Sequence, residues 1–253
     1  MLYCCFLYIR AALFNIGYFG SGVIFGTLSS LIWPLLPYPQ RYRLINQWNR
    51  FVMLWLRLCC GVRIEMRGHV HKERQPYVIM SKHQCVWETL YLQLLFQPMS
   101  TILKKELLRI PFFGWGLAAL KPIAIDRRNK TKALREVKTK GVQALNNGNS
   151  VLIFPEGTRT LPGEVVNYAR SGADIACAAG RPVIPVAHNA AECWPHKQFL
   201  KYPGTITIVI GEPIDSDGKD RKQLTEEVKE WIETTAAQLP AGRRDGQRPW
   251  LKE

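Results

Sequence analysis

The stretch "YVIMSKHQCVWETLYLQLLF", Tyr77 to Phe96, joins a short apolar run to a helical pattern through a single histidine. The run "YVIMSK" is typical of a buried strand. After it, Val86, Leu90 and Leu94 recur at the spacing of one apolar helical face, and Ser81 is a candidate N-cap. The stretch therefore predicts a strand followed directly by a helix, with His83 on the connection.

The same alternation continues along the chain. Further predicted strands cover residues 121–126, 150–157, 181–189 and 205–213. Predicted helices cover residues 86–96, 130–148, 168–180 and 222–239, and "NNG" at 146–148 ends the second of them. Strands that alternate with helices predict an α/β fold, in which a sheet is covered by helices on both faces.

The N-terminal part of the chain is far more apolar than the rest. No charged residue lies between Arg10 and Arg41. At about 1.5 Å per residue, a helix over residues 11–33 reaches roughly 34 Å, enough to cross a hydrocarbon core. Glycines in this segment are tolerated in lipid, and Pro34 and Pro37 end it sharply. Both a full span and a hairpin in one leaflet fit; a signal peptide should have a shorter apolar region and a clear cleavage site.

A second apolar stretch, "FVMLWLRLCCGV" at 51–62, is too short to span a membrane. It suits an amphipathic helix that lies in the membrane interface. We therefore expect a membrane-associated helical segment at 1–60, a folded body at 61–241 and a basic tail at 242–253.

The charge balance and the cysteines restrict the function further. The chain has 34 Lys and Arg against 20 Asp and Glu, a net charge of +14. This excess favours an anionic partner, such as an anionic membrane surface, a phosphorylated substrate or nucleic acid, although solubility alone could also account for it. Seven cysteines, with no CxxC spacing, form neither a disulfide framework nor a zinc site, which indicates a reducing compartment.

His83 and Glu88 could form an acid/base pair. On one continuous helix, positions five apart point about 140° away from each other. A contact therefore requires His83 on the turn before the helix and Glu88 in its first turns. There the carboxylate would fix the tautomer of the imidazole. From the spacing alone, a core histidine and a surface carboxylate are the favoured reading, and two further metal ligands are not evident.

Two other stretches carry candidate functional residues. In "FPEGTRT" (154–160), Gly157 permits a tight turn whose N–H groups can face an oxyanion, and Arg159 supplies a phosphate-binding fork. Glu156 and Thr158 could order that fork or bind hydroxyls, and an ordinary turn with a surface arginine is an equal alternative. The GK[ST] ending of a Walker loop is missing.

In "LKKELLRIPFFGWG" (103–116), Lys104, Lys105 and Arg109 lie beside an apolar group of residues at 111–115. This suits an amphiphile with a charged head, or a helix at the membrane interface. No DNA- or RNA-binding module is recognisable, so nucleic acid is the poorer choice of partner.

Taken in order, "KHQCVWE", "KKELLRIPFFGW", "FPEGTRT" and "VIPVAHN" resemble the four sequence blocks of the glycerolipid acyltransferases. The likeness is greatest to bacterial 1-acyl-sn-glycerol-3-phosphate (lysophosphatidic acid) acyltransferases and covers roughly residues 76 to 213. One departure is the first block, which is usually H-x4-D and here ends in Glu88. The resemblance implies the fold of that family, a mixed, largely parallel sheet covered by helices. The resemblance also favours a catalytic role for His83 over the role of a core histidine that its spacing alone favoured.

The resemblance implies acyl transfer from a coenzyme A or acyl-carrier-protein thioester to the free sn-2 hydroxyl of lysophosphatidic acid, which gives phosphatidic acid. His83 would be the general base and Glu88 would hold its ring, so that the alcohol attacks directly and Cys85 only packs. Lys105 is the first candidate for the oxyanion donor and Lys104 the second. The resemblance also assigns Glu156, Gly157, Thr158 and Arg159 to the acceptor's phosphate and Pro185 to the acyl site, and leaves His188 structural.

No metal or redox cofactor is implied. Because the implied acceptor lies in the bilayer and the donor in the cytosol, we expect the catalytic body on the cytosolic face of the bacterial inner membrane. A basic surface there attracts anionic lipids and the phosphates of coenzyme A or the acidic carrier protein. Two alternatives stay open: an acyltransferase for another lyso-lipid, such as a lyso-ornithine lipid or a lysophospholipid, and a non-catalytic membrane lipid-binding protein. A metal hydrolase fits less well.

Overall fold

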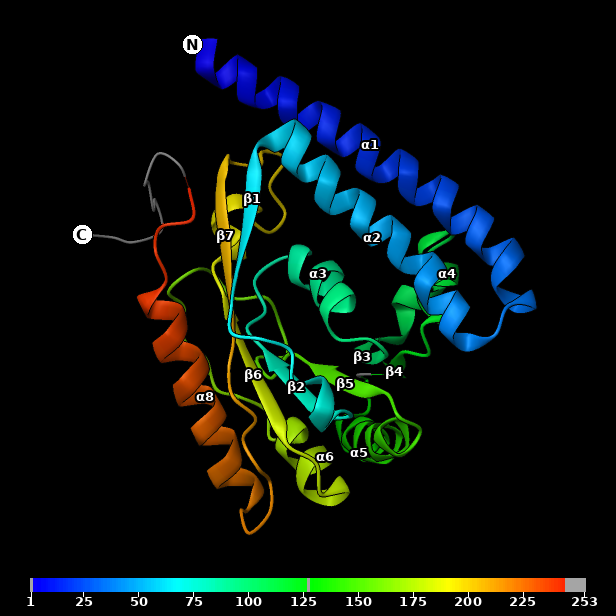
Figure 1. Cartoon of the computed structure of the whole chain (residues 1–253), viewed down its shortest axis with the longest axis vertical. Helices are drawn as coiled ribbons and strands as arrows, with labels where there is room; N and C mark the ends of the chain where they lie inside the picture. The colour runs from blue at the N-terminus through cyan, green and yellow to red at the C-terminus, as the bar shows by residue number, and fades with distance from the viewer. Residues whose placement is uncertain (1, 127, 244–253) are drawn as a thin grey trace.

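The computed structural model describes residues 2–126 and 128–243, which fold around one seven-stranded sheet (Figure 1). The strands are β1 (Val62–Arg67), β2 (Val78–Ser81), β3 (Met99–Lys104), β4 (Ile123–Ile125), β5 (Ser150–Ile153), β6 (Val183–His188) and β7 (Gly204–Ile210). Their order is β1-β7-β6-β2-β5-β3-β4, and every pair is parallel except β6 with β7. The predicted mixed, largely parallel sheet is confirmed.

Alternate residues of the central strands feed two separate cores. In β2, Val78 and Met80 join the core on one face, whereas Ile79 joins the core on the other. The period of two in strand geometry produces this division. Both faces are covered, which explains why the central strands read as continuous apolar runs.

Two helical layers cover the sheet (Figure 1). One face carries α2 (Tyr38–Cys60), α3 (Trp87–Leu95), α4 (Phe113–Ala119) and the short α7 (Ala190–Cys193); the other carries α5 (Lys130–Asn146), α6 (Ser171–Ala179) and α8 (Arg221–Gln238). Short 3-10 turns lie at Trp33–Leu35, Lys72–Arg74 and Lys105–Arg109. The four helices predicted after residue 85 are all present, with ends shifted by a few residues.

The N-terminal helix α1 (Leu2–Ile32) packs along α2 and α4 (Figure 1). It begins well before the predicted residue 11, because Arg10 does not interrupt it: the guanidinium donates to the carbonyl of Cys59 and so is accommodated against the body. Gly26 permits close packing, since a Cβ there would lie 2.6 Å from the carbonyl oxygen of Phe112. The second helix is also longer than predicted, 38–60 rather than 51–62.

Two local features of the structure differ from the prediction. Strands β1 and β3 were not anticipated. Ser81 is the last residue of β2 and not an N-cap, since α3 begins only at Trp87. The N–H groups before α3 are instead satisfied by the Glu88 carboxylate, which accepts from Gln84 and Cys85. Of the predicted basic tail at 242–253, residues 244–253 lie outside the described residues.

Candidate active site

His83 and Glu88 meet at the carboxyl end of β2. His83 lies on the turn before α3 and Glu88 in the first turn of that helix, and the distance from His83 Nδ1 to Glu88 Oε1 is 2.9 Å. The same carboxylate oxygen accepts from the N–H groups of Gln84 at 2.8 Å and Cys85 at 2.7 Å. The turn therefore brings together two residues that a continuous helix would hold apart.

The Glu88 carboxylate fixes the state of the imidazole. Burial alone would raise the pKa of Glu88, but the hydrogen bonds from His83 and from the Cys85 thiol to the carboxylate oppose it, and the pKa is lowered to about 2. An ionised carboxylate only accepts, so His83 donates its Nδ1–H to it, and Nε2 on the opposite side of the ring carries the basic lone pair. The ring is stacked on Phe154, with 4.0 Å between centroids, which restrains its rotation.

A cavity of about 1000 Å³ connects His83 with Arg159. The charged residues that line it are Lys104, Arg159 and Lys197. The histidines His83 and His196 also line it. Among the described residues, no Asp or Glu lines it. The rest is mainly apolar and includes Phe25, Ile45, Trp48, Leu117, Leu134 and Val137. The cavity therefore suits a molecule with an anionic head and a long apolar chain.

Arg159 is hydrogen-bonded to the turn that carries His83. Its Nε donates to the carbonyl of Cys85 at 3.2 Å, and its terminal nitrogen lies 3.2 Å from Nδ1 of His196. Burial and the charge of Arg159 lower the pKa of His196, which keeps that ring neutral and able to accept. The remaining N–H groups of the guanidinium are left for a ligand in the cavity.

A sequence model of the acyltransferase family, described as "Acyltransferase", matches residues 63–189. A 1-acyl-sn-glycerol-3-phosphate acyltransferase of Pseudomonas aeruginosa is 44% identical over 235 residues, which cover 91% of each chain. This chain belongs to the acyltransferase family. The resemblance of its four blocks is thereby confirmed.

More distant relatives agree with this assignment. A 1-acyl-sn-glycerol-3-phosphate acyltransferase of Limnanthes alba is 27% identical over 218 residues, covering 83% of this chain and 75% of the relative. The crystal structure of the corresponding enzyme from Thermotoga maritima, PlsC, superposes with a TM-score of 0.77 over 93% of this chain and 96% of that one, at 22% identity. The latter likeness supports the fold.

Not every residue that the acyltransferase blocks suggest reaches the cavity. Lys104, Gly157, Thr158 and Arg159 line it, and Gly157 has the positive φ of 71° that the predicted tight turn requires. Lys105 is exposed and does not line the cavity, because the chain turns from β3 into a 3-10 turn at that residue. This geometry favours Lys104 over Lys105 as the donor to an oxyanion.

Glu156 and Pro185 lie away from the cavity lining. Glu156 is buried and forms an ion pair with Lys82, at 3.0 Å from Nζ to Oε1, so it is not free to bind a substrate hydroxyl. Pro185 is buried within β6, where its ring lies next to Gly211 and its carbonyl accepts from the N–H of Gly211 at 2.9 Å. The predicted role of Pro185 in shaping the acyl site has no direct support from this position.

Cys85 and His188 take the structural places expected of them. The sulfur of Cys85 is buried, 3.0 Å from Oε2 of Glu88, and burial and this carboxylate raise the pKa of the thiol well above its usual range. His188 is buried, with Nε2 2.9 Å from the carbonyl of Lys82, and burial lowers its pKa. A neutral, fully hydrogen-bonded His188 anchors β6 to the turn.

His196 and Lys197 are the site residues that the sequence did not reveal. They follow the fourth block by several positions, on the loop after α7, and no spacing links them to Arg159. The one local feature that could have indicated an anion-binding site is that His196 and Lys197 are adjacent in "WPHKQ" (194–198).

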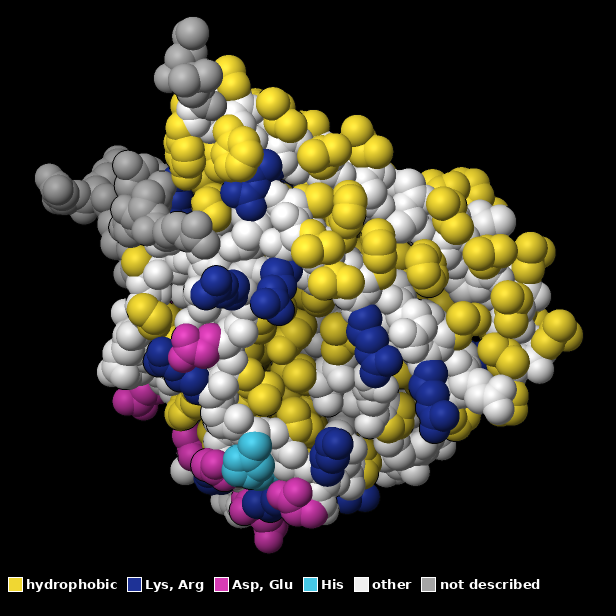
Figure 2. All heavy atoms as spheres, turned by 45° about the horizontal axis from the view of Figure 1, so that its top comes forward, with side chains coloured by type: hydrophobic (Ala, Val, Ile, Leu, Met, Phe, Trp, Pro, Cys, Tyr) yellow, Lys and Arg dark blue, Asp and Glu magenta, His cyan; other side chains and the backbone are white. Residues whose placement is uncertain are grey.

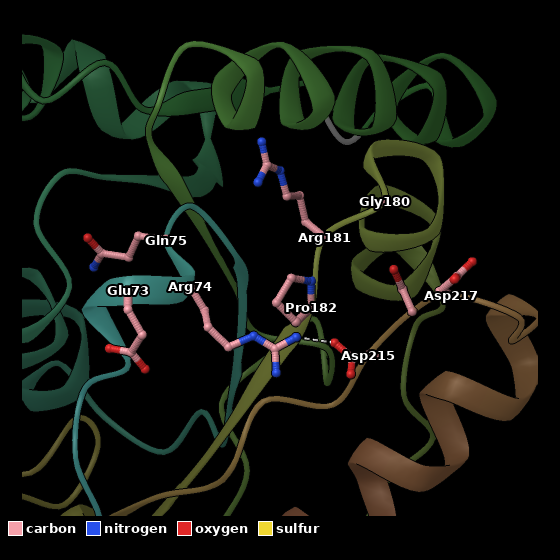
Figure 3. Close-up of a pocket in the computed structure, with 9 residues that line it drawn as sticks. Glu73, Arg74, Gln75, Gly180, Arg181, Pro182, Asp215 and Asp217 are labelled. Atoms are coloured by element: carbon pink, nitrogen blue, oxygen red, sulfur yellow. Dashed lines mark hydrogen bonds and ion pairs between the residues drawn. The ribbon is translucent and has the colours of Figure 1, made fainter.

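A second cavity, of about 330 Å³, lies near the amino ends of β2 and β6, the opposite end of the sheet from His83. Figure 3 shows that Arg74 reaches across it to form an ion pair with Asp215. None of the candidate site residues lines it. It is therefore separate from the candidate active site at His83.

Proposed function

We propose that the chain transfers an acyl group from a coenzyme A or acyl-carrier-protein thioester to the sn-2 hydroxyl of 1-acyl-sn-glycerol-3-phosphate, giving phosphatidic acid. One observation carries this proposal: the histidine held by Glu88 opens into a cavity in which every charged residue that the structure describes is a lysine or an arginine. The names of the curated relatives support the same reaction.

The geometry accounts for each step of the transfer. Nε2 of His83 takes the proton of the acceptor hydroxyl while the oxygen bonds to the thioester carbonyl carbon. Lys104 lies on the cavity wall, where its ammonium can stabilise the negative oxygen of the tetrahedral intermediate. The C–S bond then breaks, and the leaving sulfur takes the proton back from the imidazolium, so that an ester and a free thiol are formed.

The lining also bears on the acceptor. A lyso-ornithine lipid carries an ammonium group in its head, and a choline or ethanolamine lysophospholipid carries a cation beyond its phosphate. The described lining offers these cations no carboxylate, whereas Arg159 and Lys197 can both face a phosphate monoester. The charges therefore favour lysophosphatidic acid over the alternative acceptors and over a lipid-binding protein without catalysis.

Membrane association follows from α1. The helical segment Tyr3–Leu35, which includes most of α1, is long and apolar enough to cross a membrane. Figure 2 shows hydrophobic side chains gathered along α1, with a row of Lys and Arg side chains beside them. However, α1 contacts the body from Tyr8, stacked on Phe199, to Gly26. We infer that α1 lies along the cytosolic face of the bacterial inner membrane with its outer side in lipid, and that the basic row meets anionic head groups.

We expect the double substitution Ile16→Glu/Phe19→Glu to weaken vesicle binding. Both side chains are exposed, by 72% and 65%. Loss of about 1.5 kcal/mol of apolar burial at each position corresponds to a roughly hundredfold lower partition coefficient. Flotation with vesicles that contain anionic phospholipid measures this. Met66→Glu, an exposed position in β1, is the control; equal binding of all three proteins would show that α1 does not contact the membrane.

Arg159→Ala should raise the KM for lysophosphatidic acid by about 10- to 100-fold, because one charge-assisted hydrogen-bonding group is worth about 1.5–3 kcal/mol. The KM for the thioester should stay the same. Steady-state rates of thiol release, measured with a panel of lyso-lipids and with both donor types, test this. Arg109→Ala is the matched control, since Arg109 is exposed and does not line the cavity. A change in the thioester KM alone would refute the phosphate-binding role.

A further inference from the structure

Lys82, the residue before His83, is a buried cation. It is 2% exposed, and its ammonium lies between two carboxylates from distant parts of the chain. Nζ is 2.8 Å from both oxygens of Glu233 and 3.0 Å from Oε1 of Glu156, and it also donates to the carbonyl of Glu164 at 3.0 Å. All three donor directions of the ammonium are therefore occupied.

Glu156 connects Lys82 to the backbone of the turn that carries His83. Its Oε2 accepts the backbone N–H of His83 at 2.6 Å, and its Oε1 accepts the hydroxyl of Thr160 at 3.1 Å. The N–H of Thr160 in turn donates to the carbonyl of His83 at 2.8 Å. The backbone of His83 is thus held on both sides by residues 156–160.

Glu233 connects α8 to this turn. It lies beyond residues 63–189, the part that the family model matches. Its side chain is 15% exposed, and the hydroxyl of Tyr168 donates to its Oε1 at 2.8 Å. A chain of contacts consequently runs from α8 through Lys82 and Glu156 to the backbone N–H of His83.

Buried charges are a costly way to stabilise a fold. Burial raises the pKa of Glu156 above its usual range, although Lys82 opposes the shift. Apolar side chains of the same size often stabilise a core as well as a buried ion pair does, whereas ionic contacts impose a direction and a distance. A network that ends on the backbone of the catalytic histidine therefore has a use in orientation.

We propose that Glu233 is a positioning residue, which acts through Lys82 and Glu156 to fix the His83 backbone and with it the direction of Nε2 toward the acceptor hydroxyl. The proposal rests on the acyltransferase function proposed above. Because misplacement of a reacting group by about 1 Å can cost up to a hundredfold in rate, the expected effect is on turnover. Ground-state binding of either substrate is made elsewhere in the cavity and should not change.

Glu233→Gln tests this with little change of shape. We expect kcat to fall by about tenfold or more, with the KM of both substrates unchanged. Glu233→Asp, which keeps the charge, should recover part of the loss. Glu230→Gln, at an exposed position of the same helix, should behave as the wild type.

A second control distinguishes a positioning role of Glu233 from a purely stabilising one. Val228→Ala removes buried packing from α8 without touching the ion network and should lower the melting temperature. If Glu233→Gln and Val228→Ala depress the melting temperature equally and both keep wild-type kcat, the positioning role is overturned. A lower kcat in the Gln variant alone supports it.

A measurement without substrate keeps the test independent of the proposed function. In protein labelled with ¹⁵N at its five histidines, Glu233→Gln should shift the His83 amide signal and speed its hydrogen exchange, whereas Glu230→Gln should not. An unchanged His83 amide would refute the proposal even if the wild type transferred acyl groups normally. Conversely, a shifted amide in a protein that does not acylate lysophosphatidic acid would contradict only the proposed acceptor.

Discussion

His83→Ala should lower kcat for acyl transfer to lysophosphatidic acid by about 10³-fold or more, since a positioned general base contributes about 10²–10⁴-fold. No other described side chain in the cavity is held by a buried carboxylate in the same way. The protein should stay folded, because the Glu88 carboxylate keeps its two backbone donors when the ring is removed. Thiol release measures the rate, and circular dichroism with a thermal melt reports the fold.

Cys85→Ala is the informative companion to this variant. Direct attack by the acceptor alcohol predicts that Cys85→Ala keeps turnover within a few-fold of the wild type, because its raised thiol pKa disfavours the nucleophilic thiolate. A thioacyl-enzyme would instead require both Cys85 and His83. The general-base role is refuted if purified, folded His83→Ala turns over at a near-normal rate.

The fully buried strands were predictable from the sequence, whereas β1 and β3 were not. β2, β5 and β6 bury every residue, so their apolar runs stand out from the polar sequence around them. β1 is an edge strand with most of its residues partly or fully exposed, and β3 ends in a lysine, so neither has an apolar pattern that ends in a clear turn. The start of α1 was hidden because Arg10 finds its partner at Cys59, a contact that the local sequence does not show.

Some features of the candidate site were also predictable from the sequence, and others were not. The spacing of His83 and Glu88 gave a condition, that the histidine must precede the helix, and the structure meets it. Lys104 and Lys105 are adjacent, and only one of them lines the cavity. The sequence does not show which of the two, because it does not show that β3 ends at Lys104. The resemblance assigned Glu156 to the acceptor's phosphate, and the sequence could not show its ion pair with Lys82, which directly follows β2 some 70 positions earlier in the chain. Long-range pairings of this kind leave no local pattern.

Glu88→Gln should reduce kcat by about 10²–10³-fold while both KM values stay within a few-fold, because the amide no longer selects the Nδ1–H tautomer or stabilises the imidazolium that forms during proton transfer. Glu88→Asp restores the acid that the family usually has. It should keep more activity than the Gln variant, provided that the shorter side chain still reaches Nδ1. Equal turnover of wild type and Glu88→Gln would show that Glu88 serves only to cap α3.

The stability of the same variant depends on pH in a defined direction. The pKa of Glu88 is lowered to about 2 in the folded state, so its stabilising contribution is fully present above its ordinary value of 4.5 and is lost as the pH falls toward 2. A shift of this size corresponds to roughly 3 kcal/mol at neutral pH. The difference in stability between wild type and Glu88→Gln, followed by thermal unfolding in detergent, should therefore shrink between pH 4.5 and pH 2. Because all other carboxylates are common to both proteins, a difference that stays constant over this range would mean that folding does not lower the pKa of Glu88.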